Sequence, residues 1–364
     1  MAHEGCETGP TIVQWMLDTR PLWLGSQSKS AKEQMEEFKT IASRALALLP
    51  PAERQSVLKY YHVKDAKMGL ASHLLKHLVI TKHCNIPWSE SIISRDENKK
   101  PCYIPSADSP DQKYIEFNVS HQAGIVSLIA SFGFDSTVQV GTDVVCVDER
   151  LTHDYKFIEK EGFFGWVDMH GDVFAPKELD EMKLSPVELS KDILSVQLQG
   201  YGKSQISRCQ WRNQQLTFQS EYGVDGKPQQ IGPINTNDVI DQKLRRFYAF
   251  WCLREAYVKM TGEALLAPWL RDLEFRDVQP PNAKEGLSEP ESLVEGDALS
   301  ELRIFFKGKP VQNVDMDLRA YGQHFMLAGA LRVTTQGDRS KAILGSWREL
   351  DIERDVLEIA EARS

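Results

Sequence analysis

The sequence predicts an α+β protein made of two similar halves, and three observations support this prediction. Stretches with helical periodicity alternate with short apolar segments that have the length of buried strands. The chain of 364 residues is long enough for one large domain or two ordinary ones. Finally, stretches 60–66 and 250–256 resemble each other, since each has two aromatic residues, an apolar residue, a base, an acid and an alanine.

The first half is expected to end near residue 140, which divides the chain into 1–140 and 141–364. Pro50 and Pro51 interrupt its helical periodicity. A tight connection over 133–136 is expected to lead into a strand over 138–147. The earlier elements are predicted to be a strand over 12–17, helices over 31–49 and 53–77, and strands over 86–94 and 125–132.

In the second half, a strong helical pattern covers 241–261 and a core strand is expected over 325–333. Two stretches have the composition of insertions. Residues 183–240 are rich in Gln, Ser and Gly, with a hairpin expected near 211–222, and residues 277–300 are acidic and Pro-rich, typical of a mobile loop. If two similar halves pack together, the cleft between them is the default place for a functional site.

The composition is that of a soluble globular protein, with 41% hydrophobic and 26% charged residues. No apolar run has the length of a membrane helix, and the N-terminus lacks the pattern of a secretory signal, so we expect a cytoplasmic enzyme. The net charge of −9 argues against general affinity for nucleic acid, and any phosphate site must be a local basic cluster. Six scattered cysteines without a C-x-x-C pair are expected to be free thiols.

The strongest local motif is the stretch 251–259, in which Glu255 and Lys259 are four residues apart on a helix and share one face. A surface ion pair would explain this spacing equally well. The large aromatic neighbours Phe247, Phe250 and Trp251 favour a buried helix, and hence a functional pair.

A carboxylate also interrupts the apolar strand 138–147, in the sequence Gly141-Thr142-Asp143. Such a group is costly inside a core unless it is paired or binds a metal, although an aspartate that caps a neighbouring backbone is the simpler alternative. If the fold brings Asp143 close to Glu255, the two carboxylates suit Mg²⁺, which binds proteins through one or two carboxylates together with waters and phosphate oxygens.

The side chains of Ser120 and His121, in the stretch 117–121, could donate hydrogen bonds to phosphate oxygens, but ordinary turn polarity would also explain them. Basic residues that could hold phosphates are Lys64, Lys67, Arg95, Lys99 and Lys100, although most charge runs are merely solvated. Two patterns are set aside. The stretch 202–204 ends like a P-loop but lacks its first glycine, and the histidine pair His73 and His77 has no third metal ligand in evidence.

Taken in order, these motifs resemble the Sfp-type 4′-phosphopantetheinyl transferases, and the similarity is greatest to the fungal members. The matching motifs are Lys99-Lys100-Pro101, F-N-x-S-H at 117–121, G-x-D at 141–143 and W-x-x-R-E-A-x-x-K at 251–259. Stretches 60–66, 260–270 and 350–355 are also similar to fungal members. The resemblance implies a pseudo-duplicated fold with the active site between two α+β halves.

The resemblance also implies roles for eight side chains. Asp143 and Glu255 would hold Mg²⁺, and Glu255 would take the proton of the attacking serine. The remaining six would bind coenzyme A: Lys259, Ser120 and His121 at the phosphates, and Lys64, Arg95 and Lys100 at the 3′-phosphate and adenosine end. Val145 stands where bacterial members have a second acid, which leaves two protein carboxylates for the metal, and Arg254 replaces a common lysine.

The implied activity is Mg²⁺-dependent transfer of 4′-phosphopantetheine from coenzyme A to a serine of apo carrier domains, with release of 3′,5′-ADP. The implied partners are carrier domains of fatty-acid, polyketide and nonribosomal-peptide synthases and, by fungal resemblance, aminoadipate reductase. We expect a monomer, since a duplicated chain could close its own site. Two alternatives remain open: a metal-dependent phosphoesterase acting on coenzyme A or a related nucleotide, and a coenzyme A binder without activity.

Overall fold

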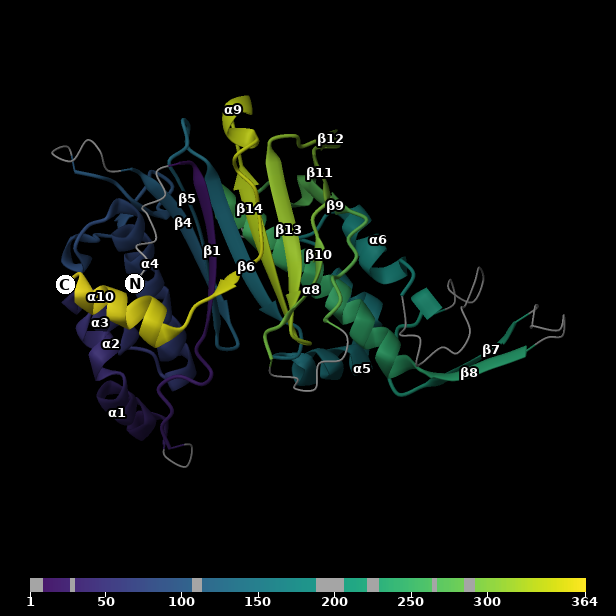
Figure 1. The fold of residues 1–364 in the computed structure, drawn as a ribbon. Helices are drawn as coiled ribbons and strands as arrows, with labels where there is room; N and C mark the ends of the chain where they lie inside the picture. Colours follow the sequence, from purple (N-terminus) through teal and green to yellow (C-terminus); the bar gives the residue numbers. More distant parts are fainter. Residues whose placement is uncertain are drawn as a thin grey trace.

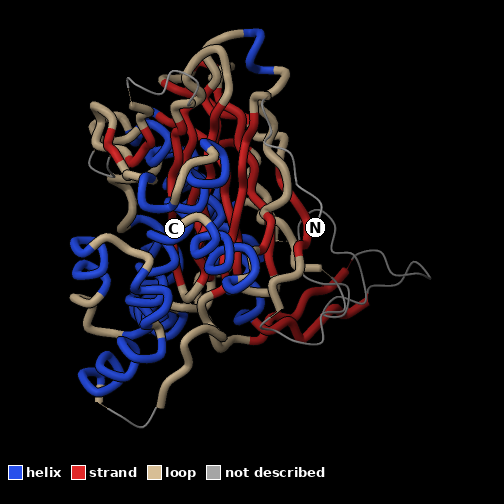
Figure 2. Tube along the Cα trace, turned by 60° about the vertical axis from the view of Figure 1, so that its left-hand side comes forward, coloured by secondary structure: helices blue, strands red, loops and turns tan. Residues whose placement is uncertain are grey.

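Two larger β-sheets lie side by side in this computed structural model, and each carries one long helix (Figure 1). The structure describes residues 9–26, 30–106, 113–187, 206–220, 229–263, 267–284 and 292–364. The strands of the two larger sheets run alongside each other through the body of the molecule, while the hairpin β7–β8 projects from it (Figure 2). The predicted mixture of helices and strands is confirmed.

The first sheet has the order β15-β1-β5-β4-β3-β2, and its neighbours are antiparallel except for the parallel pair β1–β15. These strands are β1 (Thr11–Asp18), β2 (Ser94–Arg95), β3 (Pro101–Tyr103), β4 (Ile115–Gln122), β5 (Ile125–Phe132) and β15 (Arg348–Glu349). The strands predicted at 12–17 and 125–132 are therefore confirmed. The structure also shows that the F-N-x-S-H motif lies on a full strand, β4.

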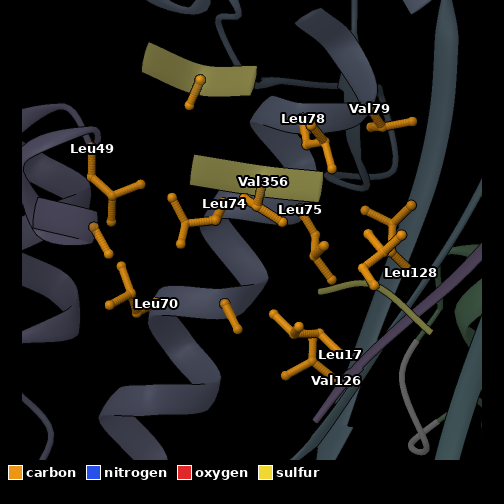
Figure 3. Close-up of a cluster of buried hydrophobic side chains, with 14 of the residues drawn as sticks. Leu17, Leu49, Leu70, Leu74, Leu75, Leu78, Val79, Val126, Leu128 and Val356 are labelled. Carbon is orange, nitrogen blue, oxygen red and sulfur yellow. The ribbon is translucent and has the colours of Figure 1, made fainter. Parts of the chain in front are cut away.

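The long helix α4 (Val63–Cys84) covers this sheet and buries an apolar stripe against it. Leu75 of this helix points toward Leu128 of β5, whereas Leu74 points to the other side, toward Leu49 (Figure 3). The end of the chain returns to the same core, because Val356 of the π-helix η3 (Ile352–Leu357) lies among these side chains and α10 (Glu358–Ala362) follows it.

Two of the helix predictions in the first half each joined two separate helices, and the second also ended seven residues before Cys84, the last residue of α4. The predicted helix 31–49 divides into α1 (Ala31–Ile41), with a capping box between Ser30 and Glu33, and α2 (Ser43–Ala47). The predicted helix 53–77 divides into α3 (Pro51–Val57) and α4. The apolar periodicity continues across these breaks because the separate helices bury their apolar faces in one common core, so periodicity alone does not reveal them.

The strand predicted at 86–94 was wrong. Most of this stretch is irregular, with a 3₁₀ turn η1 (Trp88–Glu90) and only Ser94 entering the short strand β2. Its apolar character has another cause: Trp88 is buried in the first core, and its indole N–H donates to the carbonyl of Leu48 at 2.9 Å.

The second sheet has the order β10-β13-β14-β6, and all of its neighbours are antiparallel. Its strands are β6 (Gln139–Cys146), β10 (Glu295–Leu299), β13 (Val314–Tyr321) and β14 (Phe325–Arg332). The long helix α8 (Thr236–Thr261) packs on β6 and β14, capped by the Asn235 side chain at its start and by Gly262, with φ of 78°, at its end. This confirms the predicted helix at 241–261 and the strands at 138–147 and 325–333.

The remaining described helices and strands of the second half are smaller: α5 (Leu151–Asp168), α6 (Pro176–Leu184), η2 (Leu270–Asp272), β9 (Leu273–Arg276), β11 (Arg303–Phe306), β12 (Lys309–Pro310) and α9 (Gln336–Arg339). The hairpin expected near 211–222 has its first strand there, β7 (Gln215–Ser220), but the partner β8 (Gln229–Asn235) lies further along the chain. The P-loop-like stretch 202–204 lies outside the described residues.

The connection 133–136 carries the chain from the first sheet to the second, because β5 belongs to one and β6 to the other. Five cysteines fall within the described residues, and all of them are free thiols. Over the same residues, no helix is both long and apolar enough to cross a lipid bilayer.

Candidate active site

Three of the predicted site residues meet where the two sheets come together. The Ser120 hydroxyl on β4 donates to Oδ1 of Asp143 on β6 at 2.8 Å. The Lys259 ammonium on α8 donates to the same Asp143 oxygen at 2.6 Å and to the Ser120 hydroxyl at 2.8 Å. Side chains from three separate elements thus form one hydrogen-bonded group, which we call the seam cluster.

The alternation of side chains along β4 explains why Ser120 faces β6. Residues two apart on a strand point to the same side, and Glu116, Asn118 and Ser120 form such a series. Glu116 accepts from the backbone N–H of Val140 at 3.2 Å, and Asn118 accepts from that of Thr142 at 3.1 Å. Polar side chains of β4 therefore bond the backbone of β6 across the boundary between the two sheets, which gives the asparagine of the F-N-x-S-H motif a structural role.

Gly141 lets α8 lie directly against β6. A Cβ atom at this position would come within 2.2 Å of the Ala256 carbonyl oxygen and 2.4 Å of the Met260 nitrogen, so no other residue fits without moving the helix. The buried Cys252 thiol adds a contact of 3.5 Å to the Asp143 carbonyl. The glycine of the G-x-D motif is therefore required because it brings the acidic strand and the helix into contact.

Glu255 lies on α8 one turn before Lys259 and completes the acidic part of the site. Burial raises its pKa, the nearby charge of Asp143 raises it further, and Lys259 opposes both effects. Among the described residues, no hydrogen bond engages the Glu255 carboxylate. Asp143 and Glu255 are therefore close enough to repel each other, as the hypothesis of a shared cation requires.

Lys259 is the cation already present at these carboxylates. Its side chain is 28% exposed. Burial lowers its pKa, but the ion pair and hydrogen bond with Asp143 and the charge of Glu255 outweigh burial and raise the pKa overall. Lys259 therefore stays protonated at neutral pH and can offer positive charge to a phosphate.

The two acids also suit a divalent cation. Oδ2 of Asp143 is buried and has no hydrogen-bond partner among the described residues, so one oxygen remains available for a ligand. No group of three or more His, Cys, Asp and Glu side chains is arranged for a metal in that part of the chain. Val145 is buried in the apolar core with α8, so the position of the acid in bacterial members offers no third carboxylate.

His121 follows Ser120 on β4 and therefore points to the opposite side, toward α4. Its ring is exposed. Desolvation by its surroundings lowers its pKa, and the positive charge of Lys259 lowers it further. His121 thus lies next to the seam cluster and on the side from which α4 contributes basic groups.

Lys64 lies at the start of α4, beside a pocket of about 460 Å³ beyond the end of β4. Arg20 and Lys67 also line this pocket, and Glu149 lies 3.9 Å from the Lys64 ammonium. Arg95 is exposed on β2 and donates to the Lys99 carbonyl at 2.6 Å. Both predicted bases therefore remain accessible to solvent.

Lys76, a half-buried lysine further along α4, was not among the predicted bases. Burial lowers its pKa, Glu53 opposes that shift, and Arg95 adds to it. Its charge also acts on His121. A lysine inside the apolar run of α4 was a usable signal, since such a residue is rarely buried without a reason.

Two predicted residues have structural partners. Lys100 is only 6% exposed, and its ammonium donates to Glu116 and to the carbonyls of Val140 and Met260, which occupies all three of its N–H groups. Arg254 is completely buried, where it pairs with Glu178 of α6 and donates to backbone carbonyls.

The candidate site thus combines two carboxylates, a protonated lysine and a hydroxyl, and basic side chains of α4 lie nearby. This combination suits an enzyme that acts on a phosphorylated substrate. The family model "4′-phosphopantetheinyl transferase, N-terminal" matches residues 34–133. The chain is 35% identical to 4′-phosphopantetheinyl transferase 1 of Fusarium mangiferae, over 98% of both chains. It is 38% identical to a 4′-phosphopantetheinyl transferase of Aureobasidium melanogenum, over 96% of this chain and 97% of that one.

A shorter match covers 28% of this chain and 31% of the mouse L-aminoadipate-semialdehyde dehydrogenase-phosphopantetheinyl transferase, at 30% identity. The two fungal relatives are similar over nearly their whole length. The chain therefore belongs to the 4′-phosphopantetheinyl transferase family, as its motifs predicted.

Proposed function

We propose that this enzyme transfers the phosphopantetheine arm of coenzyme A to a serine of apo carrier domains and that it requires Mg²⁺. The observation that carries the proposal is the seam cluster of Ser120, Asp143 and Lys259, with Glu255 beside it. In a member of this family, these are the groups needed to neutralise a pyrophosphate and to accept a proton from an attacking hydroxyl.

We further infer that the fold is a duplication of one β-α-β-β unit. The first unit is β1, α4, β4 and β5, and the second is β6, α8, β13 and β14. In each unit, the first strand pairs antiparallel with the last, and the last two strands form a hairpin. All six strands have eight residues, which supports a common origin.

In the mechanism we propose, Glu255 accepts the proton of the carrier serine as the serine oxygen attacks the β-phosphorus of coenzyme A. The bond from that phosphorus to the bridging oxygen breaks, and 3′,5′-ADP leaves with the bridging oxygen. Lys259 stays protonated and stabilises the negative charge on the phosphoryl oxygens. No hydrogen bond among the described residues engages the Glu255 carboxylate, and this supports its role, since the carboxylate remains available to accept a proton.

Asp143 and Glu255 are the residues we propose to hold Mg²⁺, which would supply positive charge at the pyrophosphate. The buried Oδ2 atom of Asp143, without a partner among the described residues, supports this assignment. Ser120 keeps Oδ1 of the same carboxylate engaged, so the side chain is already oriented before a ligand arrives.

We assign the phosphates of coenzyme A to Ser120, His121 and Lys259, and its 3′-phosphate and adenosine end to Lys64 and Arg95. The accessibility of both bases and the electrostatic coupling of His121 to Lys259 support this assignment. We leave Lys100 out of this set because protein acceptors occupy its ammonium.

Carrier domains of fatty-acid, polyketide and nonribosomal-peptide synthases are the proposed partners. The name of the mouse relative supports adding the aminoadipate-reducing enzyme to them. We also propose that the protein acts as a monomer, because the groups of the seam cluster all come from one chain. As the sequence leads us to expect, we propose that it acts in the cytoplasm.

The test is to incubate the enzyme with coenzyme A and Mg²⁺, with and without an apo carrier domain. We expect the carrier to gain the mass of one phosphopantetheine and 3′,5′-ADP to form only when the carrier is present. A carrier with alanine in place of its serine should remain unmodified, and EDTA should stop the reaction. Release of nucleotide without any carrier would instead establish the phosphoesterase alternative, and no reaction in either case would refute both activities.

A further inference from the structure

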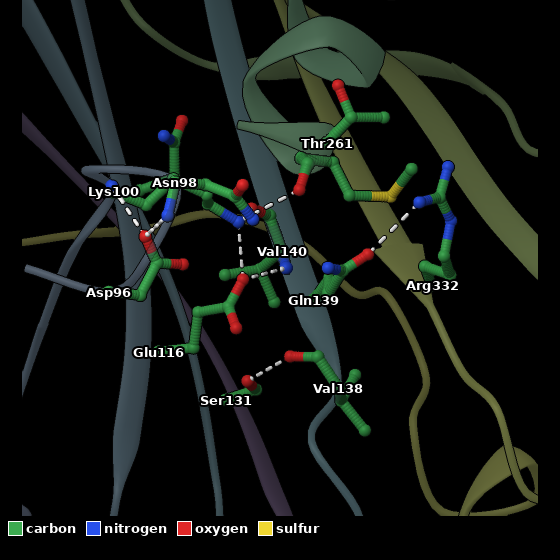
Figure 4. Close-up of polar contacts among 12 residues, drawn as sticks. Asp96, Asn98, Lys100, Glu116, Ser131, Val138, Gln139, Val140, Thr261 and Arg332 are labelled. Atoms are coloured by element: carbon green, nitrogen blue, oxygen red, sulfur yellow. Dashed lines mark hydrogen bonds and ion pairs between the residues drawn. The ribbon is translucent and has the colours of Figure 1, made fainter. Parts of the chain in front are cut away.

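Lys100 makes a buried contact that joins four segments of the chain. It lies at the end of a short hairpin loop before β3, and Glu116 lies on β4, with side chains 6% and 4% exposed. The Lys100 ammonium donates to Glu116, to the Val140 carbonyl at 3.2 Å and to the Met260 carbonyl at 2.9 Å (Figure 4). We call this group the lysine clamp.

Each partner of Lys100 lies close in sequence to one member of the seam cluster. Glu116 precedes Ser120 by four residues on β4, and Val140 precedes Asp143 by three residues on β6. Met260 directly follows Lys259 in the last turn of α8. The lysine clamp therefore bonds to β4, β6 and α8, the same three elements whose side chains meet in the seam cluster.

The surroundings of Lys100 fix its position closely. The Asp96 carboxylate accepts from the backbone N–H of Lys100 at 2.8 Å, which closes the loop. Gly262, which ends α8, lies against the Lys100 side chain: a Cβ atom there would come within 2.9 Å of Lys100 Cδ. The loop and the end of α8 are thus in close contact at Lys100.

We propose that Lys100 and Glu116 are positioning residues that set Lys259 and Asp143 in register with Ser120, without contacting the substrate. This proposal rests on the proposed function for its kinetic part. Burying both charges so completely costs desolvation free energy. In return, the pair has a fixed geometry in which all three N–H groups of the lysine have acceptors. Displacement of a catalytic group by about 1 Å can cost about a hundredfold in rate.

The test compares the double variant Lys100→Met/Glu116→Gln with the wild-type enzyme. Removing both charges together avoids leaving one of them buried alone, so the fold is expected to survive, and a thermal melt checks this. We expect kcat to fall about ten- to hundredfold, while the KM for coenzyme A changes by less than about threefold. The single variant Glu116→Gln, which keeps an acceptor for Lys100, should show a smaller loss in kcat and serves if the double variant does not fold.

A second substrate separates positioning from phosphate binding. Dephospho-coenzyme A lacks the 3′-phosphate, so a residue that binds this phosphate discriminates between the two substrates. Arg95→Ala should lose much of that discrimination, whereas the double variant should keep it. If the double variant raises KM and loses discrimination, or if a folded double variant keeps its kcat, the proposal is wrong.

Hydrogen exchange tests the positioning role independently of whether the proposed function is correct. Hydrogen exchange of the backbone amides in residues 255–263 should become faster in the double variant, because the hold on the last turn of α8 is lost. Amides in the middle of α4 should exchange as before and serve as the internal control. Unchanged exchange at the end of α8 would overturn the clamp, even if the enzyme proved to act on another substrate.

Discussion

Each of the two long helices of this enzyme is attached to a shorter helix through a single glutamate. The residue type that the glutamate contacts differs between the two, and we call each attachment a tie. On α8, the fully buried guanidinium of Arg254 pairs with Glu178 of α6, and neither side chain is exposed. On α4, the two histidines His73 and His77 each lie 2.9 Å from one carboxylate oxygen of Glu53, on α3. The first tie is completely buried, whereas the Glu53 and His73 side chains of the second are each 21% exposed.

This difference parallels the work of the two helices. The same helix carries Glu255 and Lys259, and Lys259 must be held rigidly against Asp143 of β6. The exposed part of α4 contributes bases around a pocket, where long, solvated side chains can adjust to a ligand. We infer that α8, which carries candidate site residues, needs the more deeply buried attachment.

Removing the arginine of the α8 tie is expected to have the largest effect. Arg254→Met leaves the Glu178 carboxylate buried without its cation, which should lower the free energy of unfolding by about 3–5 kcal/mol. Burial already raises the pKa of Glu178 to about 6 although Arg254 opposes it, so the variant should be least stable above that pH. Urea unfolding at pH 5 and pH 8 measures both effects.

The matched control is Arg271→Met, since Arg271 is exposed on η2 and should be replaceable within about 0.5 kcal/mol. The double variant Arg254→Met/Glu178→Gln should regain part of the lost stability. Equal stability of the Arg254→Met variant and the wild-type enzyme would show that the buried pair does not anchor α8.

Replacing Glu255, which directly follows Arg254 on α8, should lower activity without lowering the free energy of unfolding. We expect Glu255→Gln to lower kcat about 100- to 1,000-fold, because it removes the proposed proton acceptor and one of the two carboxylates proposed to hold Mg²⁺. Its free energy of unfolding should stay the same or rise slightly, since burial and Asp143 both disfavour the charged form of Glu255. Steady-state kinetics with an apo carrier, together with urea unfolding, separates the two quantities.

The comparison with the first half provides the control. Asp65 occupies the place of Glu255 in the similar stretch 60–66 of α4, but it does not belong to the seam cluster. Asp65→Asn should therefore change kcat by less than about threefold. A loss as large as that of Glu255→Gln would mean that both halves contribute an essential acid.

Much of this site was predictable, because its motifs are short and lie within single elements. Asp143 interrupting an apolar strand and Glu255 four residues before Lys259 were visible as patterns, and the resemblance supplied their roles. The contacts of Glu116 and Asn118 with β6 could not be predicted from the sequence. Their hydrogen bonds to the backbone of Val140 and Thr142 cross between two sheets and depend on the tertiary fold. The buried contacts of Lys100 were hidden for the same reason, as its three acceptors come from three separate segments.

The fold was predictable to a similar degree. The strand β5 is largely apolar, and α8 has a glycine at its end, although the helix begins five residues before its predicted start. The failures at 86–94 and at the breaks after α1 and α3 have one cause, since apolar side chains of irregular segments enter the same core as those of helices and strands. The return of the last segment to β1 was also hidden, because a two-residue strand such as β15 leaves no periodic pattern.

The smallest expected effect concerns the tie of α4 and shows its dependence on pH. Burial raises the pKa of Glu53, but its hydrogen bonds to His73 and His77 outweigh burial and lower the pKa overall. A lowered carboxylate pKa contributes stability that is present above the unfolded value of about 4.3 and is lost as the pH falls below it. Glu53→Gln should therefore cost about 1.5–3 kcal/mol at pH 6, and the difference from wild type should narrow below about pH 4. Urea unfolding from pH 3.5 to 7 measures this, with Glu36→Gln on the exposed face of α1 as the control that should change little. A constant difference across that range would show that the carboxylate charge does not hold α4, and the contrast between the two helices would then rest on α8 alone.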